Sequence, residues 1–205
     1  MKNIFSLLII VLGLSVSTQL DAQIKTPAAS PTAKMSTTVG LTDIGIEYSR
    51  PSKNGRKIFG DLVPFDAIWR TGANKNTTIT FSDDVVIGGT ELKKGDYAIF
   101  TKPGKTDWEV YFYNDTENWG SPEKWDDTKV AAKVMVTPQN VSNTETFTIN
   151  LGNVTNESCT LDLTWDNLNV PVKIMVPTDK KVSANITQVM AGPSAGDYYN
   201  AARYY

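Results

Sequence analysis

The residues best suited to chemistry lie in the segment FDAIWRTGANKNTTITF, residues 65–81, where Trp69, Arg70 and Asn74 precede an alternating, strand-like run. An arginine guanidinium presents a planar fork of donors that suits a carboxylate or phosphate, and an asparagine amide both donates and accepts. Gly72 permits a positive φ or a close approach of the backbone to a ligand. The segment is therefore a candidate pocket for a small anionic or sugar-like ligand.

The same residue types also suit a structural role. An arginine flanked by tryptophan and glycine can clamp a loop by donating to its carbonyls and to a carboxylate such as Asp66. We expect Arg70 to act as such a clamp, with a ligand role as the alternative, and both roles can coexist. Arginines upstream and a tryptophan from another loop extend the candidate set. The candidate ligand-binding residues are Arg50, Arg56, Trp69, Arg70, Asn74 and Trp119.

Several classes of catalysis are excluded by composition. The chain has no histidine and a single cysteine, Cys159, which removes Ser-His-Asp and Cys-His catalysis, His-ligated metals and CxxC redox pairs. We predict no catalytic residue, no metal and no cofactor. Cys159 alternates with apolar residues and is expected to face the core. The remaining enzymatic alternative is a carboxylate-based glycan hydrolase, whose candidate acids are Asp66, Glu117, Glu123 and Asp126.

The N-terminus has the pattern of a secretory signal peptide over residues 1–22. Lys2 precedes an apolar run at residues 4–16, which is shorter than the roughly 20 residues that span a bilayer, and Ala22 offers a cleavage point. We therefore expect an exported protein, periplasmic or extracellular, that is soluble after cleavage and has no transmembrane segment. A net charge of −2 gives no electrostatic drive toward nucleic acid.

Apolar residues alternate with polar ones along most of the remaining chain. After a flexible leader at residues 23–34, this period predicts an all-β domain over residues 35–177, with roughly nine strands in an antiparallel β-sandwich or jelly-roll-like barrel. Gly88-Gly89 fits a tight hairpin turn, and Asp166-Asn167 fits a turn between the last two strands. Ser121 with Pro122 fits the start of a single helical turn.

Residues 178–205 are expected to form a short helical tail. Val182, Ile186 and Val189 fall on one helical face, and the segment DYYNAARYY also has helix-forming spacing. A short helix is marginal in water by itself, so the tail must dock on the sandwich or bind a partner. A structural or assembly protein that docks through the tyrosine-rich tail is therefore an alternative function.

The run RPSKNGRKIFGDLVPFDAIWRTGANKNTTITF, continued by GDYAIF and NWG, resembles the domain of unknown function 2911 family over about residues 35–190. The resemblance implies an exported protein of Bacteroidetes-type bacteria, and the family carries no assigned activity. Some relatives continue into tetratricopeptide-like helices, which DYYNAARYY resembles. The function we expect is a noncatalytic binding or scaffold module of the bacterial envelope, with a small ligand or an envelope protein as partner.

Overall fold

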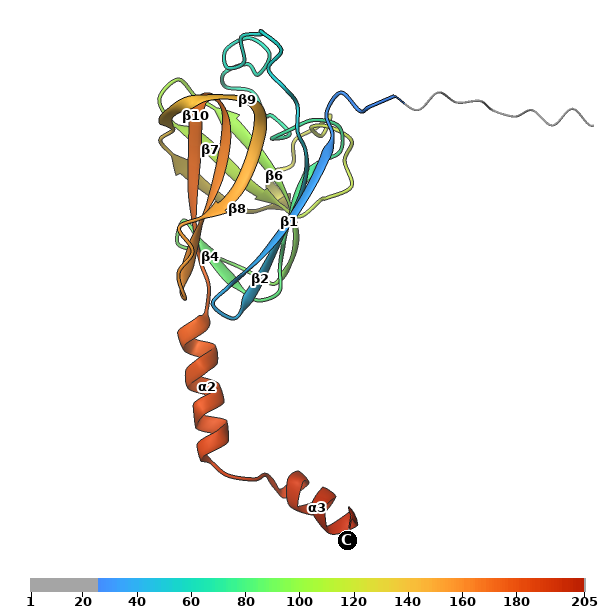
Figure 1. Cartoon of the computed structure of the whole chain (residues 1–205), viewed down its shortest axis with the longest axis vertical. Coiled ribbons are helices and arrows are strands. Elements are labelled where there is room, and N and C mark those ends of the chain that lie inside the picture. Colours follow the sequence, from blue (N-terminus) through green and yellow to red (C-terminus); the bar gives the residue numbers. More distant parts are fainter. Residues whose placement is uncertain (1–25, 205) are drawn as a thin grey trace, which may run out of the picture.

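A computed structural model describes residues 26–204, so the predicted signal peptide lies outside the described residues. Antiparallel strands of this part form two sheets, a six-stranded sheet in the order β1-β2-β3-β6-β7-β8 and a four-stranded sheet in the order β5-β4-β10-β9 (Figure 1). The strands of the larger sheet are β1 (Thr32–Val39), β2 (Thr42–Ser49), β3 (Thr77–Phe81), β6 (Gly95–Pro103), β7 (Trp108–Tyr113) and β8 (Val130–Val136). Those of the smaller sheet are β4 (Val85–Ile87), β5 (Thr90–Leu92), β9 (Gln139–Gly152) and β10 (Ser158–Met175).

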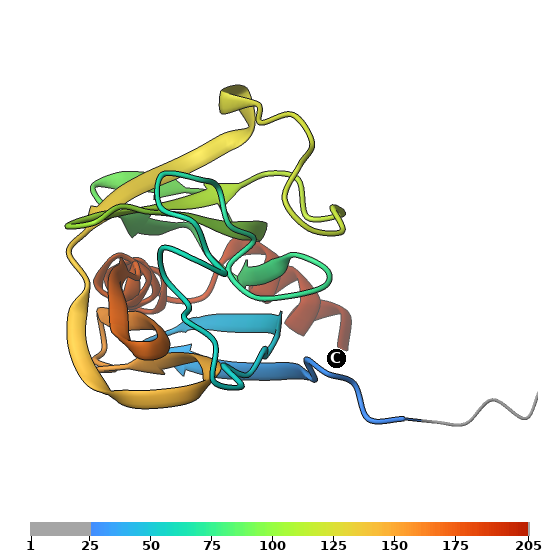
Figure 2. The same ribbon diagram turned by 90° about the horizontal axis from the view of Figure 1, so that it is seen from above.

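The two sheets form a sandwich, seen from above in Figure 2, which confirms the all-β prediction and decides against the closed barrel. Alternation along each strand sends one set of side chains into the space between the sheets. In β7, Trp108, Val110 and Phe112 are buried in this core, and Cys159 of β10 lies in it as expected. The opposite face of β7 carries Tyr111 and Tyr113, which belong to a second, smaller apolar cluster.

The Gly88-Gly89 turn is confirmed, because both residues have positive φ, 57° and 82°, between β4 and β5. The prediction of a turn at Asp166-Asn167 was wrong. β10 runs unbroken through this point, and the register against β9 shifts on both sides of Asp166, whose φ is 53°. A residue in the left-handed region can produce a β-bulge as well as a turn, and here it bends a single long strand.

Two other local predictions change. The helical turn lies at Asp127–Lys129, and the Asp126 side chain accepts from the backbone N–H of Thr128 at its start, so the prediction at Ser121 was wrong. The first strand begins at Thr32, inside the segment expected as a leader, because residues 32–39 pair with β2 along their whole length.

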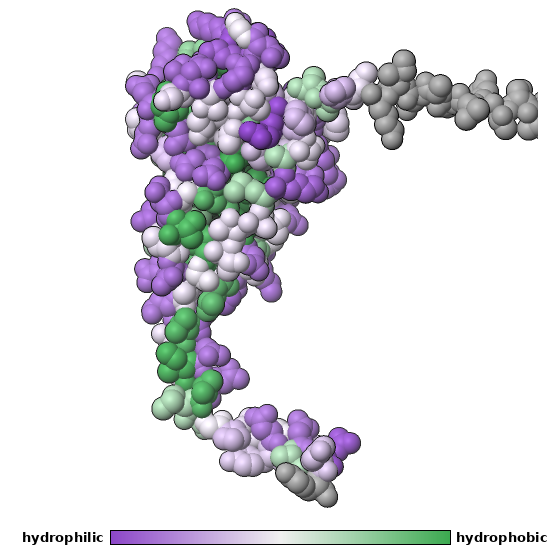
Figure 3. Space-filling view, viewed as in Figure 1, coloured by the Kyte–Doolittle hydropathy of each residue, from purple (hydrophilic) through white to green (hydrophobic). Residues whose placement is uncertain are grey.

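Helices α2 (Thr178–Met190) and α3 (Ala195–Tyr204) form the tail and extend away from the sandwich, with no buried residue in either (Figure 1). Lys181 attaches the N-terminal part of α2 to the sandwich. Its Nζ lies 2.8 Å from both carboxylate oxygens of Asp83 and 2.9 Å from the carbonyl oxygen of Leu41. Val182, Ile186 and Val189 remain exposed on α2, which Figure 3 shows as a green stripe below the domain. Among residues 26–204, no helix combines the length and apolar content needed to cross a bilayer.

Candidate functional site

The long connection between β2 and β3, residues 50–76, folds over one end of the sandwich and is tied to both sheets (Figure 1). On one side it meets β9, where the Lys53 N–H donates to the Glu145 carbonyl at 2.7 Å. On the other side Trp69 and Thr101 of β6 exchange backbone hydrogen bonds of 2.7 and 3.0 Å. These bonds fix the two halves of the loop independently, and a hollow remains between them.

The hollow is a cavity of about 350 Å³. Its walls come from the N-terminal segment, the 50–76 loop and one residue of β10, which are far apart in the sequence. No aspartate or glutamate contributes to its lining, whereas two arginines do. The lining residues are Ala29, Ser30, Pro51, Ser52, Asn54, Arg56, Leu62, Val63, Trp69, Arg70, Gly72, Ala73 and Trp165.

Both cavity arginines donate only to backbone carbonyls. Arg56 Nε lies 2.9 Å from the Lys53 oxygen and its Nη2 lies 2.6 Å from the Ser52 oxygen, while Arg70 Nη1 lies 3.2 Å from the Asn74 oxygen. Within residues 26–204, neither guanidinium has a carboxylate at ion-pair distance. A guanidinium has five N–H donors, so each arginine keeps donors for an incoming anion.

An aromatic wall lies beside these charges. The rings of Trp69 and Trp165 are stacked, with centroids 5.8 Å apart and an 18° angle between their planes. Phe147 packs edge-on against Trp69 at 5.3 Å, and the indole N–H of Trp165 donates to the Glu145 carbonyl at 3.1 Å. The wall is therefore held rigidly by packing and by a hydrogen bond.

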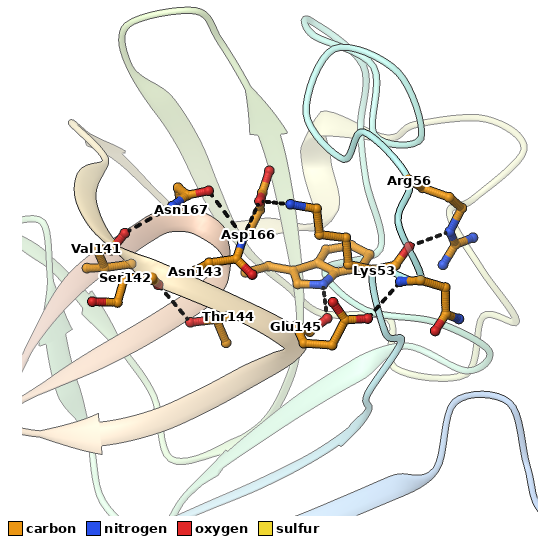
Figure 4. A network of polar contacts seen from close by, with 11 residues as sticks. Lys53, Arg56, Val141, Ser142, Asn143, Thr144, Glu145, Asp166 and Asn167 are labelled. Carbon is orange, nitrogen blue, oxygen red and sulfur yellow. Dashed lines mark hydrogen bonds and ion pairs between the residues drawn. The ribbon is translucent and has the colours of Figure 1, made fainter.

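Two acids near the cavity, Asp166 and Glu145, have hydrogen-bond partners, which Figure 4 shows. Asp166 contacts the Lys53 ammonium and accepts from the Asn143 amide at 3.0 Å. Glu145 accepts from the Asn54 backbone N–H at 2.7 Å. Both carboxylates therefore have hydrogen-bond partners other than the cavity arginines, and Asp166 is also paired with a cation, Lys53.

Of the six candidate residues, the structure brings Arg56, Trp69 and Arg70 together in the cavity. Arg50 lies instead between the sheets, with its Nε 3.3 Å from the Phe147 oxygen and its Nη2 3.0 Å from Thr148 Oγ1. The Asn74 amide donates to the Ser30 carbonyl and to Ser49 Oγ, both at 3.3 Å. Trp119 is 76% exposed and lies outside the cavity lining.

Arg70 donates to a loop carbonyl, that of Asn74, as the predicted clamp requires, but Asp66 is not its carboxylate partner. The Asp66 backbone N–H donates to the Pro103 carbonyl at 2.8 Å, and Asp66 forms no ion pair with Arg70 in the described part of the chain. The inter-sheet contacts of Arg50 fit a clamp better, because they join the 50–76 loop to β9 across the open edge between the sheets. Arg70 is therefore the less constrained of the two guanidinium groups.

Backbone strain is concentrated in the same loop. Asp66, Thr71 and Asn74 have φ values of 60°, 54° and 59°, which is unusual for residues with a Cβ and more so for β-branched threonine. Thr71 is held there by hydrogen bonds, since its Oγ1 lies 3.1 Å from Thr101 Oγ1 and its carbonyl accepts from Thr77 Oγ1 at 2.5 Å. Residues in such conformations persist where the surroundings over-determine them, and they are common at ligand sites.

The acids proposed for a hydrolase, Asp66, Glu117, Glu123 and Asp126, do not line the cavity. Hydrogen bonds from the side chain and backbone of Thr128 lower the pKa of Asp126, the opposite of what a general acid needs. The described residues also contain no group of three or more His, Cys, Asp or Glu side chains that could hold a metal.

The sequence did not single out several of the lining residues. Trp165 alternates with core residues of β10, and a strand pattern alone cannot show that its ring also reaches the end of the sandwich. Ser30 and Asn54 lie in segments without periodicity. Only the path of the 50–76 loop brings them to the cavity, so no local pattern could have identified them.

Fold and site together define a two-sheet β-sandwich with a cationic, aromatic-walled cavity under a long loop. The family described as Protein of unknown function (DUF2911) matches residues 30–174, and the chain belongs to this family, which confirms the resemblance. Neither a search of curated proteins nor one of solved structures gave a significant match.

Proposed function

We propose that this protein is a noncatalytic binding module that holds a small organic anion in the cavity under the 50–76 loop. The observation that carries the proposal is the pair Arg56 and Arg70, which face a cavity without an acidic lining residue and keep free donors. Guanidinium groups with open donors bind carboxylate and phosphate groups in a two-pronged geometry.

The rest of the cavity supports an organic ligand rather than a bare ion. Trp69, Leu62 and Val63 offer apolar surface, and the Asn54 side-chain amide offers both a donor and an acceptor. Ligand sites generally combine a mostly apolar lining with a few placed polar groups, in cavities of about 300–1,000 Å³. The volume of about 350 Å³ suits a single sugar-sized molecule.

We also propose that the module acts outside the cytoplasm, in the periplasm or beyond it. The support is the signal-peptide pattern of residues 1–22. Mass spectrometry of protein recovered from the periplasmic fraction tests this. A mature N-terminus at Gln23 is the expected result, and an uncleaved chain in the cytoplasm would contradict it.

Isothermal titration of residues 23–205 tests the ligand site. The probes are acetate, inorganic phosphate, D-galactose, D-galacturonate and D-glucuronate. We expect at least one acidic probe to bind, and Arg70→Gln and Arg56→Gln each to weaken it by about tenfold or more. Arg203→Gln on the exposed α3 is the matched control and should leave binding unchanged. Absence of binding to every acidic probe, or binding that survives both cavity substitutions, would refute the proposal.

A second candidate function, assembly through the tail, is favoured by the exposure of Val182, Ile186 and Val189 on α2. Burial of such a stripe against a partner would stabilise a helix that buries nothing in this chain. Light scattering of the parent and of Ile186→Glu over a range of concentrations tests this. A change from oligomer to monomer supports assembly, and a parent that is already monomeric at high concentration excludes self-assembly.

A further inference from the structure

The loop between β7 and β8, residues 114–129, adjoins the 50–76 loop and carries an exposed aromatic side chain, Trp119. The structure anchors this loop directly to the cavity loop. Asn76 N–H donates to the Asn118 carbonyl at 3.2 Å, and Ser121 Oγ lies 3.3 Å from the Ile68 carbonyl. Trp119 itself is bridged to Lys75 through the backbone. Its position relative to the 50–76 loop is thus fixed by hydrogen bonds.

Arg70 joins the cavity to this loop. Its guanidinium lines the cavity and also packs against Gly120, where an added Cβ would stand only 3.3 Å from Nη1. Gly120 also has a φ of 97°, so two constraints favour glycine there. Because Trp119 directly precedes Gly120, the exposed indole lies one residue from the guanidinium contact.

The two tryptophans of this loop, Trp119 and Trp125, have different environments. Trp125 stacks on Tyr113 with centroids 4.7 Å apart and covers the small cluster on the outer face of β7. Trp119 is 76% exposed, with polar neighbours in sequence and a Lys75–Glu117 ion pair of 3.3 Å close by. Packing therefore explains Trp125 but leaves the flat indole of Trp119 facing solvent.

We infer that the ligand is an acidic oligosaccharide, with one uronate-like unit in the cavity at Arg56 and Arg70 and the adjoining unit stacked on Trp119. This inference rests on the proposed ligand site and extends it from a single unit to a chain. A sugar ring has an apolar C–H face and a polar rim, which matches an isolated indole surrounded by hydrogen-bonding groups. Arginine clusters also recognise acidic peptides, but a polyacidic peptide has no flat C–H face to stack on the isolated indole of Trp119.

Titration calorimetry with chains of increasing length tests the inference on residues 23–205. The probes are mono-, di- and trigalacturonate, the matching glucuronate-containing oligosaccharides, and triglutamate as the peptide competitor. We expect the disaccharide to bind about tenfold more tightly than the monosaccharide, because one stacking contact is added. Quenching of indole fluorescence by the disaccharide, but much less by the monosaccharide, should accompany the gain.

Three variants separate the parts of the site. Trp119→Ala should remove the gain with chain length and leave monosaccharide affinity unchanged, whereas Trp119→Phe should keep most of the gain. Arg70→Gln should weaken the binding of saccharides of every length.

If the monosaccharide binds through Arg70 but neither chain length nor Trp119→Ala changes the affinity, the inference fails and the proposed function stands. If triglutamate binds more tightly than any saccharide, the oligosaccharide class is wrong. If no acidic compound binds at all, both proposals fail together.

Discussion

Trp69 of the β2–β3 connection stacks on Trp165 of β10, with ring centroids 5.8 Å apart and an 18° angle between the planes. This contact makes the loop part of the core. The same pair forms the apolar wall of the cavity, while Arg56 and Arg70 form its cationic side. The Trp69 side chain therefore contributes both to the stability of the loop and to the wall of the proposed ligand cavity.

Replacement of Trp69 by alanine should lower the free energy of unfolding by about 3 kcal/mol, because the contacts to Trp165 and Phe147 are lost and a void is left. Trp119→Ala is the matched control. Its side chain is 76% exposed, so the loss should stay below about 0.5 kcal/mol. Urea unfolding followed by circular dichroism measures both, and equal losses would contradict the assigned role of Trp69.

Two of the three arginines of the loop, Arg50 and Arg70, should contribute unequally to stability. Arg50→Ala should cost about 1–2 kcal/mol of stability, since the hydrogen bonds to the Phe147 carbonyl and Thr148 Oγ1 between the sheets disappear. Arg70→Ala loses one bond to the Asn74 carbonyl and should cost less than about 0.5 kcal/mol. Thermal unfolding in the absence of ligand compares them, and a larger loss for Arg70→Ala would make its bond to the Asn74 carbonyl the stronger clamp of the loop.

Gly72→Ala should destabilise the loop strongly. Gly72 has a φ of 144°, and an added Cβ would lie 3.0 Å from the Ser49 carbonyl oxygen and 3.1 Å from Thr77 Oγ1. Steric conflict adds to backbone strain there, so we expect a loss of about 2 kcal/mol or more.

The control for that substitution is Gly55→Ala, where φ is 72° but no atom lies within 4 Å of the added Cβ. Strain alone should cost about 1 kcal/mol at that site. Chemical denaturation of both variants gives the comparison. A loss at Gly55 as large as that at Gly72 would show that the close approach to Ser49 and Thr77 has no energetic consequence.

The attachment of α2 should weaken in acid. The hydrogen bond from the Lys181 ammonium is the main cause that lowers the pKa of Asp83 below its ordinary value of 3.8. A lowered folded-state pKa means that the contribution is complete above about pH 4 and is lost as the pH falls through the folded-state value. For this partly exposed pair the contribution should be below about 1 kcal/mol.

Amide exchange of α2 between about pH 5 and pH 2, read at matched intrinsic rates, measures that loss. The protection of α2 should fall in the parent relative to the sandwich strands. Asp83→Asn should show the low protection already at pH 5, with little further change on acidification. A pH dependence in Asp83→Asn equal to that of the parent would assign the effect to another carboxylate.

Cys159 should be inert in the folded protein. Burial raises the pKa of its thiol to about 11, and the side chain is only 1% exposed, so neither access nor ionisation favours reaction. With a disulfide reagent at about pH 8, the native chain should react far more slowly than the chain in guanidinium chloride. Equal rates in the two conditions would place the thiol at the surface.

The β-rich fold could be read from the sequence because its signals are local. Alternation in β7 put Trp108, Val110 and Phe112 on one face, and Gly88-Gly89 marked a hairpin whose φ values the structure confirms. The prediction failed where the same residue type suits two backbone geometries, a turn and a β-bulge. Asp166 adopts a positive φ that suits a turn, yet it forms a bulge because β9 continues to pair beyond it.

The sequence by itself determined the membership of the family, the antiparallel all-β class and the buried cysteine, and it predicts a site at the 65–81 segment. It also predicts export, which remains a prediction. Only the tertiary structure decided which of the candidate residues meet. Arg56, Trp69 and Arg70 share a cavity with Trp165, whereas Arg50 ties the sheets together and Asn74 holds Ser30 and Ser49. Periodicity reports which face of a strand is buried, but the route of a long loop depends on contacts with distant strands, and those contacts leave no local pattern.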